Sequence, residues 1–190
     1  MITEHFTALS EALGRLGAAA PTIDRWGRHL AEVLGSGGRL LAAGNGGSAA
    51  EAQHLTGELV GRYLHDRPPF SAIALHADTS AGTAIVNDYG EQEMFARQVR
   101  AHGRPGDVLV LLSTSGRSQN VCAAAKTAHE EGLTTWALTG PLPNSLAGLC
   151  DDAIAVEADS TATVQEAHLA IVHTLCAVFD RAIGVEGMVA

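Results

Sequence analysis

Residues 38–48 read GRLLAAGNGGS, an apolar run followed at once by a turn with three glycines. The run Gly38–Gly44 is apolar at adjacent positions, as expected for a strand buried on both faces of a parallel sheet. The glycines permit a tight turn and a close approach of the backbone to a ligand. A helical period follows over Ser48–His65, and Ser48 is suited to cap that helix. This strand–turn–helix unit predicts an α/β fold.

The same alternation continues along the chain. Further strands are expected at Ser71–Ala77, Asp107–Ser113, Thr134–Gly140 and Asp152–Ala158. Helices are expected at Thr79–Asn87, Glu91–His102, Ser118–Gly132 and Thr161–Ile183, with a short one after the Pro-containing loop near residue 141. Residues 1–35 read as two helices broken around Gly17–Pro21. We therefore expect one domain over 1–190, with a five-stranded parallel sheet covered by helices on both faces and ligands beyond the strands' carboxyl ends.

Composition restricts the function classes. The chain carries 12 basic and 21 acidic residues, a net charge of −9, which argues against a nucleic-acid partner. No apolar run approaches the roughly 20 residues that span a bilayer, and the N-terminus lacks a signal-peptide pattern, so we expect no membrane partner and a cytoplasmic location. Cys122, Cys150 and Cys176 are widely spaced, as expected for buried thiols in a reducing compartment. Lys126, the only lysine, has no evident activating neighbour.

A second polar turn, STSGRS at residues 113–118, follows the third expected strand. Hydroxyl groups and free N–H groups at the start of a helix suit a phosphate. The alternative is an ordinary serine cap with a solvated turn. Because two such turns follow strands of one sheet, we favour phosphate binding. Neither a Walker A loop nor a GxGxxG fingerprint is present, so a nucleotide cofactor is poorly supported.

Two helical segments carry candidate metal ligands. His54 and Glu58 are four residues apart on one helix face, a spacing that fits a shared divalent ion but also an ordinary exposed pair. Gln165 and His173 are separated by about 12 Å along the last helix, so both reach one ion only at full stretch. His168 is an alternative ligand, and the two histidines are equally compatible with a core role. Spacing alone leaves these alternatives open.

The segments GNGGSAAEAQHLTGELVGRY, Asn87-Asp88, STSGRS and QEAHLAIVH, taken in order, resemble the phosphosugar isomerase (SIS) domain family, and more narrowly the phosphoheptose isomerases. The resemblance covers nearly the whole chain. It implies an α/β/α sandwich with a five-stranded parallel sheet, a homotetramer in which residues 1–35 serve in assembly, and sites near subunit interfaces. It also implies isomerisation of sedoheptulose 7-phosphate to D-glycero-D-manno-heptose 7-phosphate through an enediolate.

The resemblance assigns roles to individual residues. It implies a zinc ion, one per subunit, and a sugar phosphate substrate. Glu58 and His173 are the implied base and acid, and the implied zinc ligands are His54, Glu58, Gln165 and His173. The implied substrate contacts are Asn45, Gly46, Gly47, Ser48, Glu58, Arg62, Asn87, Asp88, Ser113, Thr114, Ser115, Ser118 and Gln165.

Arg117, beside the phosphate serines, stands where many members of the family have asparagine. Two other function classes deserve comparison. A non-catalytic protein of this fold that binds a replication initiator lacks the glutamate and the final histidine, whereas this chain has Glu58 and His173. A sugar-phosphate-sensing regulator is usually fused to a DNA-binding segment, for which this chain has neither the length nor the basic charge.

Overall fold

A computed structural model describes residues 2–185. Its centre is one sheet of five parallel strands in the order β2-β1-β3-β4-β5. The strands are β1 (Leu40–Gly44), β2 (Ala72–Ala74), β3 (Val108–Ser113), β4 (Thr134–Thr139) and β5 (Asp152–Ala155). Gly44 pairs with Leu112, and Ser113 pairs with Thr139. The predicted parallel sheet and its strand number are confirmed.

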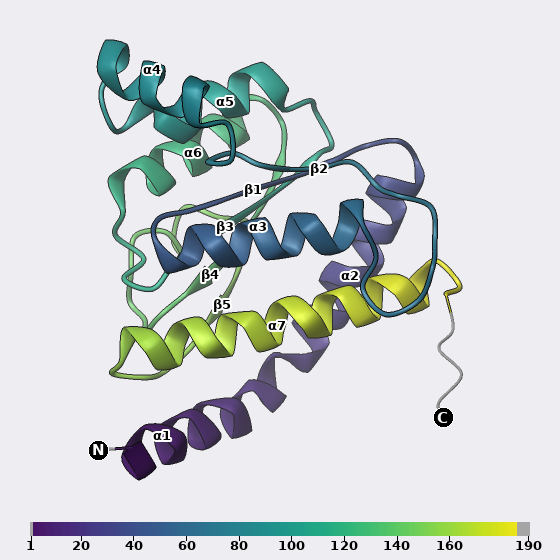
Figure 1. Cartoon of the computed structure of the whole chain (residues 1–190), viewed down its shortest axis with the longest axis vertical. Coiled ribbons are helices and arrows are strands. Elements are labelled where there is room, and N and C mark those ends of the chain that lie inside the picture. The colour runs from purple at the N-terminus through teal and green to yellow at the C-terminus, as the bar shows by residue number, and fades with distance from the viewer. Residues whose placement is uncertain (1, 186–190) are drawn as a thin grey trace.

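Helices cover both faces of the sheet (Figure 1). On one face lie α2 (Ala20–Gly35), α3 (Gly47–Val60) and α7 (Thr161–Ala182), and on the other lie α4 (Thr79–Tyr89), α5 (Glu93–His102) and α6 (Gln119–Glu130). A further helix, α1 (Ile2–Arg15), packs on α7, and a short 3₁₀ helix (Leu16–Ala19) joins it to α2. The arrangement is the expected three-layer sandwich preceded by N-terminal helices.

Alternating strand side chains build two separate cores. Leu40 and Ala42 face the core under α2, α3 and α7, whereas Leu41 and Ala43 face the core under α5 and α6. All four side chains are fully buried. This two-sided burial explains the unbroken apolar run in the sequence, because neither face of a central parallel strand meets water.

Several element boundaries differ from the prediction. The helix expected to reach His65 ends at Val60, and Gly61 follows it. The edge strands β2 and β5 are shorter than expected, because each pairs with a neighbour on one side only. The expected break at Gly17–Pro21 is a 3₁₀ turn that stays helical. The prediction of a short helix after the Pro-containing loop is wrong: residues 145–149 form turns, and the Leu146 N–H donates to the Gly116 carbonyl of a distant segment.

The strand order places the topological switch point of the sheet at the carboxyl ends of β1 and β3. The chain leaves β1 toward α3 on one face, and leaves β3 toward α6 on the other face. In open α/β sheets, ligands bind next to two neighbouring strands whose connections leave toward opposite faces of the sheet. The GNGGS turn follows β1 and the STSGRS turn follows β3, so the two turns flank this switch point.

One described helix, α7, is long and apolar enough to cross a bilayer. It instead packs against α2 and α3, with more than half of its apolar window inside the protein. The core of a globular fold accounts for its composition.

Candidate functional site

The turn after β1 places the start of α3 at the switch point between β1 and β3. Gly46 precedes the helix with a φ of +57°, a conformation that favours glycine, and no side chain caps the helix. The predicted Ser48 cap is wrong, because Ser48 is the second residue of α3 and is buried. A side chain on Gly44 would collide with the Ser48 backbone, which explains the glycine there. Among the described residues no side chain caps α3, and the N–H groups of Ser48, Ala49 and Ala50 donate to the Asn45 and Gly46 carbonyls of the turn itself.

The turn after β3, STSGRS, lies on the other side of the switch point. The Ser113 and Ser118 hydroxyls lie 3.1 Å apart, and the Ser115 hydroxyl accepts a hydrogen bond from the Arg117 backbone at 3.2 Å. Ser118 precedes α6 without a side-chain cap bond. The described residues thus form no serine cap here, whereas the exposed Ser115 with its local bond to Arg117 fits the solvated-turn alternative as well as a phosphate site.

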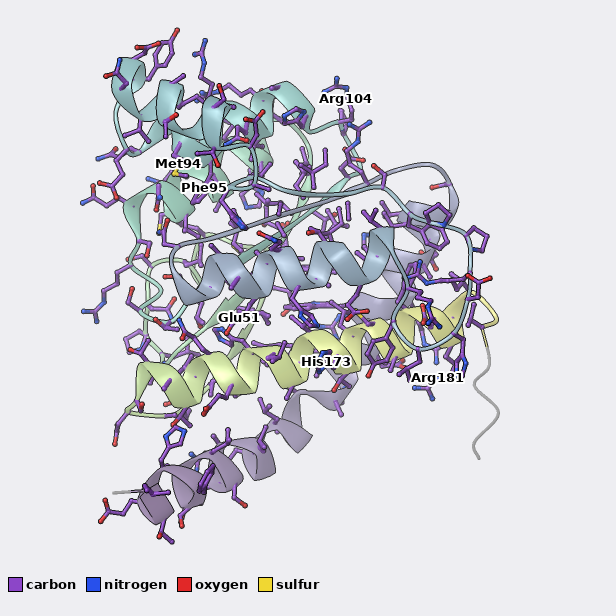
Figure 2. The ribbon with its side chains drawn as sticks, viewed as in Figure 1. Glu51, Met94, Phe95, Arg104, His173 and Arg181 are labelled. Atoms are coloured by element: carbon purple, nitrogen blue, oxygen red, sulfur yellow. The ribbon has the colours of Figure 1, made fainter. Side chains whose placement is uncertain are left out.

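His54, Glu58 and His173 form a tight cluster between α3 and α7. The His54 Nε2 lies 3.1 Å from Glu58 Oε1 and 3.0 Å from His173 Nε2. Figure 2 shows His173 on the side of α7 that faces α3. The His54 side chain is 40% exposed and that of Glu58 is 19% exposed, so the cluster is open to a substrate. The sequence had left open whether these residues meet, and the tertiary structure brings them together.

The donor chemistry of this cluster fits a divalent metal. One potential ligand atom from each side chain lies within 4.8 Å of the other two. A neutral imidazole nitrogen offers either a proton or a lone pair, so His54 Nε2 cannot donate to both of its neighbours. An ion held at about 2.0–2.2 Å from each atom would use all three lone pairs at once. Two imidazoles and a carboxylate are also a common ligand set for zinc.

Gln165 lies beside the glycine turn. A Cβ on Gly47 would stand only 2.4 Å from Gln165 Nε2, so the amide is directly against this glycine. Gln165 is thereby placed at the amino end of α3, beside the GNGGS turn. Its inclusion among the metal ligands stays a prediction.

His168, the alternative ligand, belongs to the core. Its ring is fully buried, with Nε2 3.1 Å from the Thr139 carbonyl and Nδ1 3.7 Å from Glu51 Oε2. Figure 2 places Glu51 on α3 beside α7. His168 therefore hydrogen-bonds α7 to β4 and lies near Glu51 of α3, and of the two histidines it is His173 that joins the cluster.

Three other predicted contacts are not brought to the cluster by any observed contact. Asn87 and Asp88, at the end of α4, are exposed and bonded to each other at 2.8 Å. Asn87 lines a separate cavity of about 400 Å³ with His76 and Met94. Arg62 lies past α3, is exposed, and donates to the Leu64 carbonyl.

Sequence reasoning missed two residues of this region. Buried Asn120 on α6 exchanges two hydrogen bonds, of 2.9 and 3.0 Å, with Asn45, and so joins the two turns. Tyr63 stacks on His173 with ring centroids 5.8 Å apart. Burial raises the pKa of Tyr63, and Cys176 and Glu58 add to the effect, so its hydroxyl stays protonated near neutrality. Tyr63 closes the GNGGSAAEAQHLTGELVGRY segment but carried no assigned role, and a position next to the STSGRS turn was the only hint of Asn120.

Comparison with known proteins gives a consistent picture. The SIS-domain family profile matches residues 4–140. A phosphoheptose isomerase from Streptomyces coelicolor is 64% identical over 182 residues, covering 96% of this chain and 79% of the relative. A solved phosphoheptose isomerase from Francisella tularensis superposes with a TM-score of 0.89 at 35% identity, covering 95% of this chain and 96% of that one. Another, from Neisseria gonorrhoeae, gives a TM-score of 0.84 at 42% identity, covering 95% of both chains.

Proposed function

The chain belongs to the SIS-domain family of phosphosugar isomerases, and we propose that it converts sedoheptulose 7-phosphate to D-glycero-D-manno-heptose 7-phosphate through an enediolate. It is an aldose–ketose isomerase. The observation that carries the proposal is the His54–Glu58–His173 cluster, which lies on the same face of the sheet as the start of α3. A binding module without turnover would have no need of a carboxylate and an imidazole in contact.

The two turns hold the substrate. The hydroxyls of the STSGRS turn (Ser113, Thr114, Ser115 and Ser118) bind the phosphate, helped by the start of α6. Asn45, Gly46, Gly47 and Ser48 contact the sugar, with Gln165 beside them. Anchoring the phosphate fixes the position and orientation of the rest of the sugar for the proton transfers. Arg62, Asn87 and Asp88 supply further contacts.

Glu58 acts as the base and His173 as the acid. The Glu58 carboxylate moves a proton between C1 and C2 of the sugar, and His173 transfers protons at the two oxygens. Negative charge develops on the carbonyl oxygen during this exchange and requires a nearby positive partner. No redox cofactor is needed, because the reaction moves hydrogen within one molecule.

His54, Glu58, Gln165 and His173 would hold one Zn²⁺ per subunit. When bound, the ion acts as a Lewis acid on the substrate oxygens and orients them. His54 serves only as a ligand, whereas Glu58 and His173 have both tasks. A carboxylate that binds metal tightly is a weaker base, so the proposal requires Glu58 to exchange between the two roles.

Replacing Glu58 by Gln tests the base directly. The substitution keeps the size of the side chain and removes its charge, so we expect turnover to fall by at least 100-fold with an unchanged melting temperature. The assay follows formation of the aldoheptose 7-phosphate, before chelation, after chelation and after return of zinc. More than a few per cent of activity in Glu58→Gln would end the base assignment, and a folded, zinc-loaded parent without turnover would favour the binding module.

We also propose one domain over 1–190, a cytoplasmic location and a homotetramer. Ile2, Phe6 and Leu13 on α1 are exposed apolar side chains, which an assembly through residues 1–35 would cover. In the described part of the chain, the printed hydrogen bond of Asn87 and Asp88 joins them to each other and not to the cluster, so a site completed by a second subunit is consistent with their roles. The three cysteines are free thiols, in keeping with a reducing compartment. Light scattering during gel filtration measures the assembly state.

A further inference from the structure

Arg67 is a fully buried arginine outside the site described above, in the loop after α3. Its Nε donates to Asp180 Oδ1 at 2.8 Å, and its guanidinium lies about 5 Å from the rings of Phe70 and Phe179. Further donors go to backbone carbonyls, with Nη2 to Glu58 at 2.6 Å and Nη1 to Leu59 at 3.0 Å and to Pro68 at 3.2 Å. A buried charge with this many fixed bonds has a defined structural task.

The two carbonyls belong to the last turn of α3. This helix ends at Val60, so neither carbonyl has a partner four residues further along the helix, although the Phe70 N–H donates to the Leu59 carbonyl at 3.1 Å. Helix ends fray when such groups are left to water. The proposed base therefore sits where a helix is normally least rigid. Arg67 supplies donors to both carbonyls, and its positive charge matches the negative end of the α3 dipole.

The same guanidinium reaches the second helix of the site. α3 and α7 lie side by side in the same direction, with Gly47 against Gln165, Glu51 near His168 and His54 against His173 (Figure 1). Asp180 lies seven residues beyond His173 on α7. The Arg67–Asp180 ion pair continues this series of contacts at the carboxyl ends of the two helices. One side chain thus joins the helix that carries Glu58 to the helix that carries His173.

We propose that Arg67 is a positioning residue for isomerisation: it holds the last turn of α3 against α7, so that Glu58 keeps its place relative to His173 and His54. The proposal rests on the proposed roles of Glu58 and His173. Arg67 touches neither substrate nor reacting atoms. Its effect runs through the backbone of Glu58, whose Cα direction determines where the carboxylate can reach.

Arginine is required here by geometry as well as by charge. Its planar fork has five N–H donors, enough for one carboxylate and several carbonyls in different directions, whereas a lysine ammonium is a compact point charge. The partner is equally constrained. Asp180 Oδ2 is buried without a hydrogen-bond partner among the described residues, so loss of Arg67 alone would leave an unpaired charge in the interior. A single Arg67 variant would therefore lose stability as well as positioning, and a loss of activity could not be assigned to either effect.

A double variant separates the two effects. Arg67→Met/Asp180→Leu replaces the buried ion pair with apolar side chains of similar size, a change that often preserves stability. We expect a melting temperature near that of the parent, a kcat at least tenfold lower and a KM changed by less than about threefold. We also expect Zn²⁺ affinity, measured by competition with a chromophoric chelator, to fall by about 10–100-fold, as for other residues that orient ligands. The matched control is Arg39→Met, which disturbs a half-buried ion pair between the segments just before β1 and just before β3, and should leave kcat unchanged.

Arg67→Lys gives a second test if the double variant does not fold. It keeps a cation for Asp180 but cannot hold both carbonyls, so we expect reduced kcat and zinc affinity in a folded protein. Parental kcat and zinc affinity in either folded variant would overturn the positioning role. Glu58→Gln in the parent background distinguishes the two failures: if it stays active, the base assignment is wrong, whatever the Arg67 variants do.

Discussion

Gly47→Ala tests whether the site depends on the close approach of α3 to Gln165. The added Cβ would lie 2.4 Å from Gln165 Nε2, whereas ordinary contact begins at 3.4 Å, so the amide must move by about 1 Å. The obstacle is the far end of a flexible side chain, so we expect the fold to absorb the change. A displacement of about 1 Å in a site can reduce the rate by about 100-fold. We therefore expect a large loss of kcat/KM with little change in stability.

Two other glycines of the same region provide controls. In Gly57→Ala the new Cβ meets nothing within 4 Å on an exposed face of α3, so the variant should gain about 0.5–1 kcal/mol of stability. In Gly44→Ala the Cβ would lie 2.7 Å from the Ser48 backbone, which cannot move aside, so we expect a loss of about 1–3 kcal/mol.

The assay combines turnover of sedoheptulose 7-phosphate, zinc affinity and urea unfolding for the three variants. The reasoning predicts three different outcomes: inactive but stable for Gly47→Ala, more stable for Gly57→Ala, and destabilised for Gly44→Ala. Parental kcat/KM and zinc affinity in Gly47→Ala would refute the placement of Gln165 in the site. A strong destabilisation of Gly47→Ala would show instead that the Gln165 amide cannot move.

Two further predictions concern Asn120, beside the proposed phosphate turn, and the thiols of Cys150 and Cys176. Asn120→Asp removes the donor to Asn45 and adds a negative charge next to the proposed phosphate turn, so KM should rise about tenfold or more and inhibition by inorganic phosphate should weaken; an unchanged KM would contradict the phosphate assignment. Burial raises the pKa of Cys150 and of Cys176 to about 12, so at pH 8 both remain thiols in the folded protein. Mass spectrometry after alkylation should find both protected until the protein unfolds, and rapid native labelling of Cys176 would contradict its burial.

Much of the fold was predictable because its signals are local. A buried parallel strand must be apolar at consecutive positions, as in Leu40–Ala43, and a strand-to-helix turn must contain glycine. These features specify an α/β sheet and place two polar turns at its carboxyl edge. The least accurate predictions were at element ends, such as the carboxyl end of α3, where the outcome depends on neighbouring segments. The helix expected after the Pro-containing loop failed for the same reason, because the Leu146 N–H bonds to the Gly116 carbonyl of a distant segment.

The sequence by itself determined the layered fold, the family and the candidate residues, because periodicity, turn chemistry and ordered motifs are readable along the chain. Only the tertiary structure decided that His173, and not His168, meets His54 and Glu58, since that choice depends on how α7 is rotated against α3. It alone showed that Asn120 hydrogen-bonds to Asn45 of the other turn and that Arg67 donates to the Glu58 carbonyl. Each of these contacts joins residues from different segments, and the relative position of two packed helices is encoded in the whole core and not in either helix.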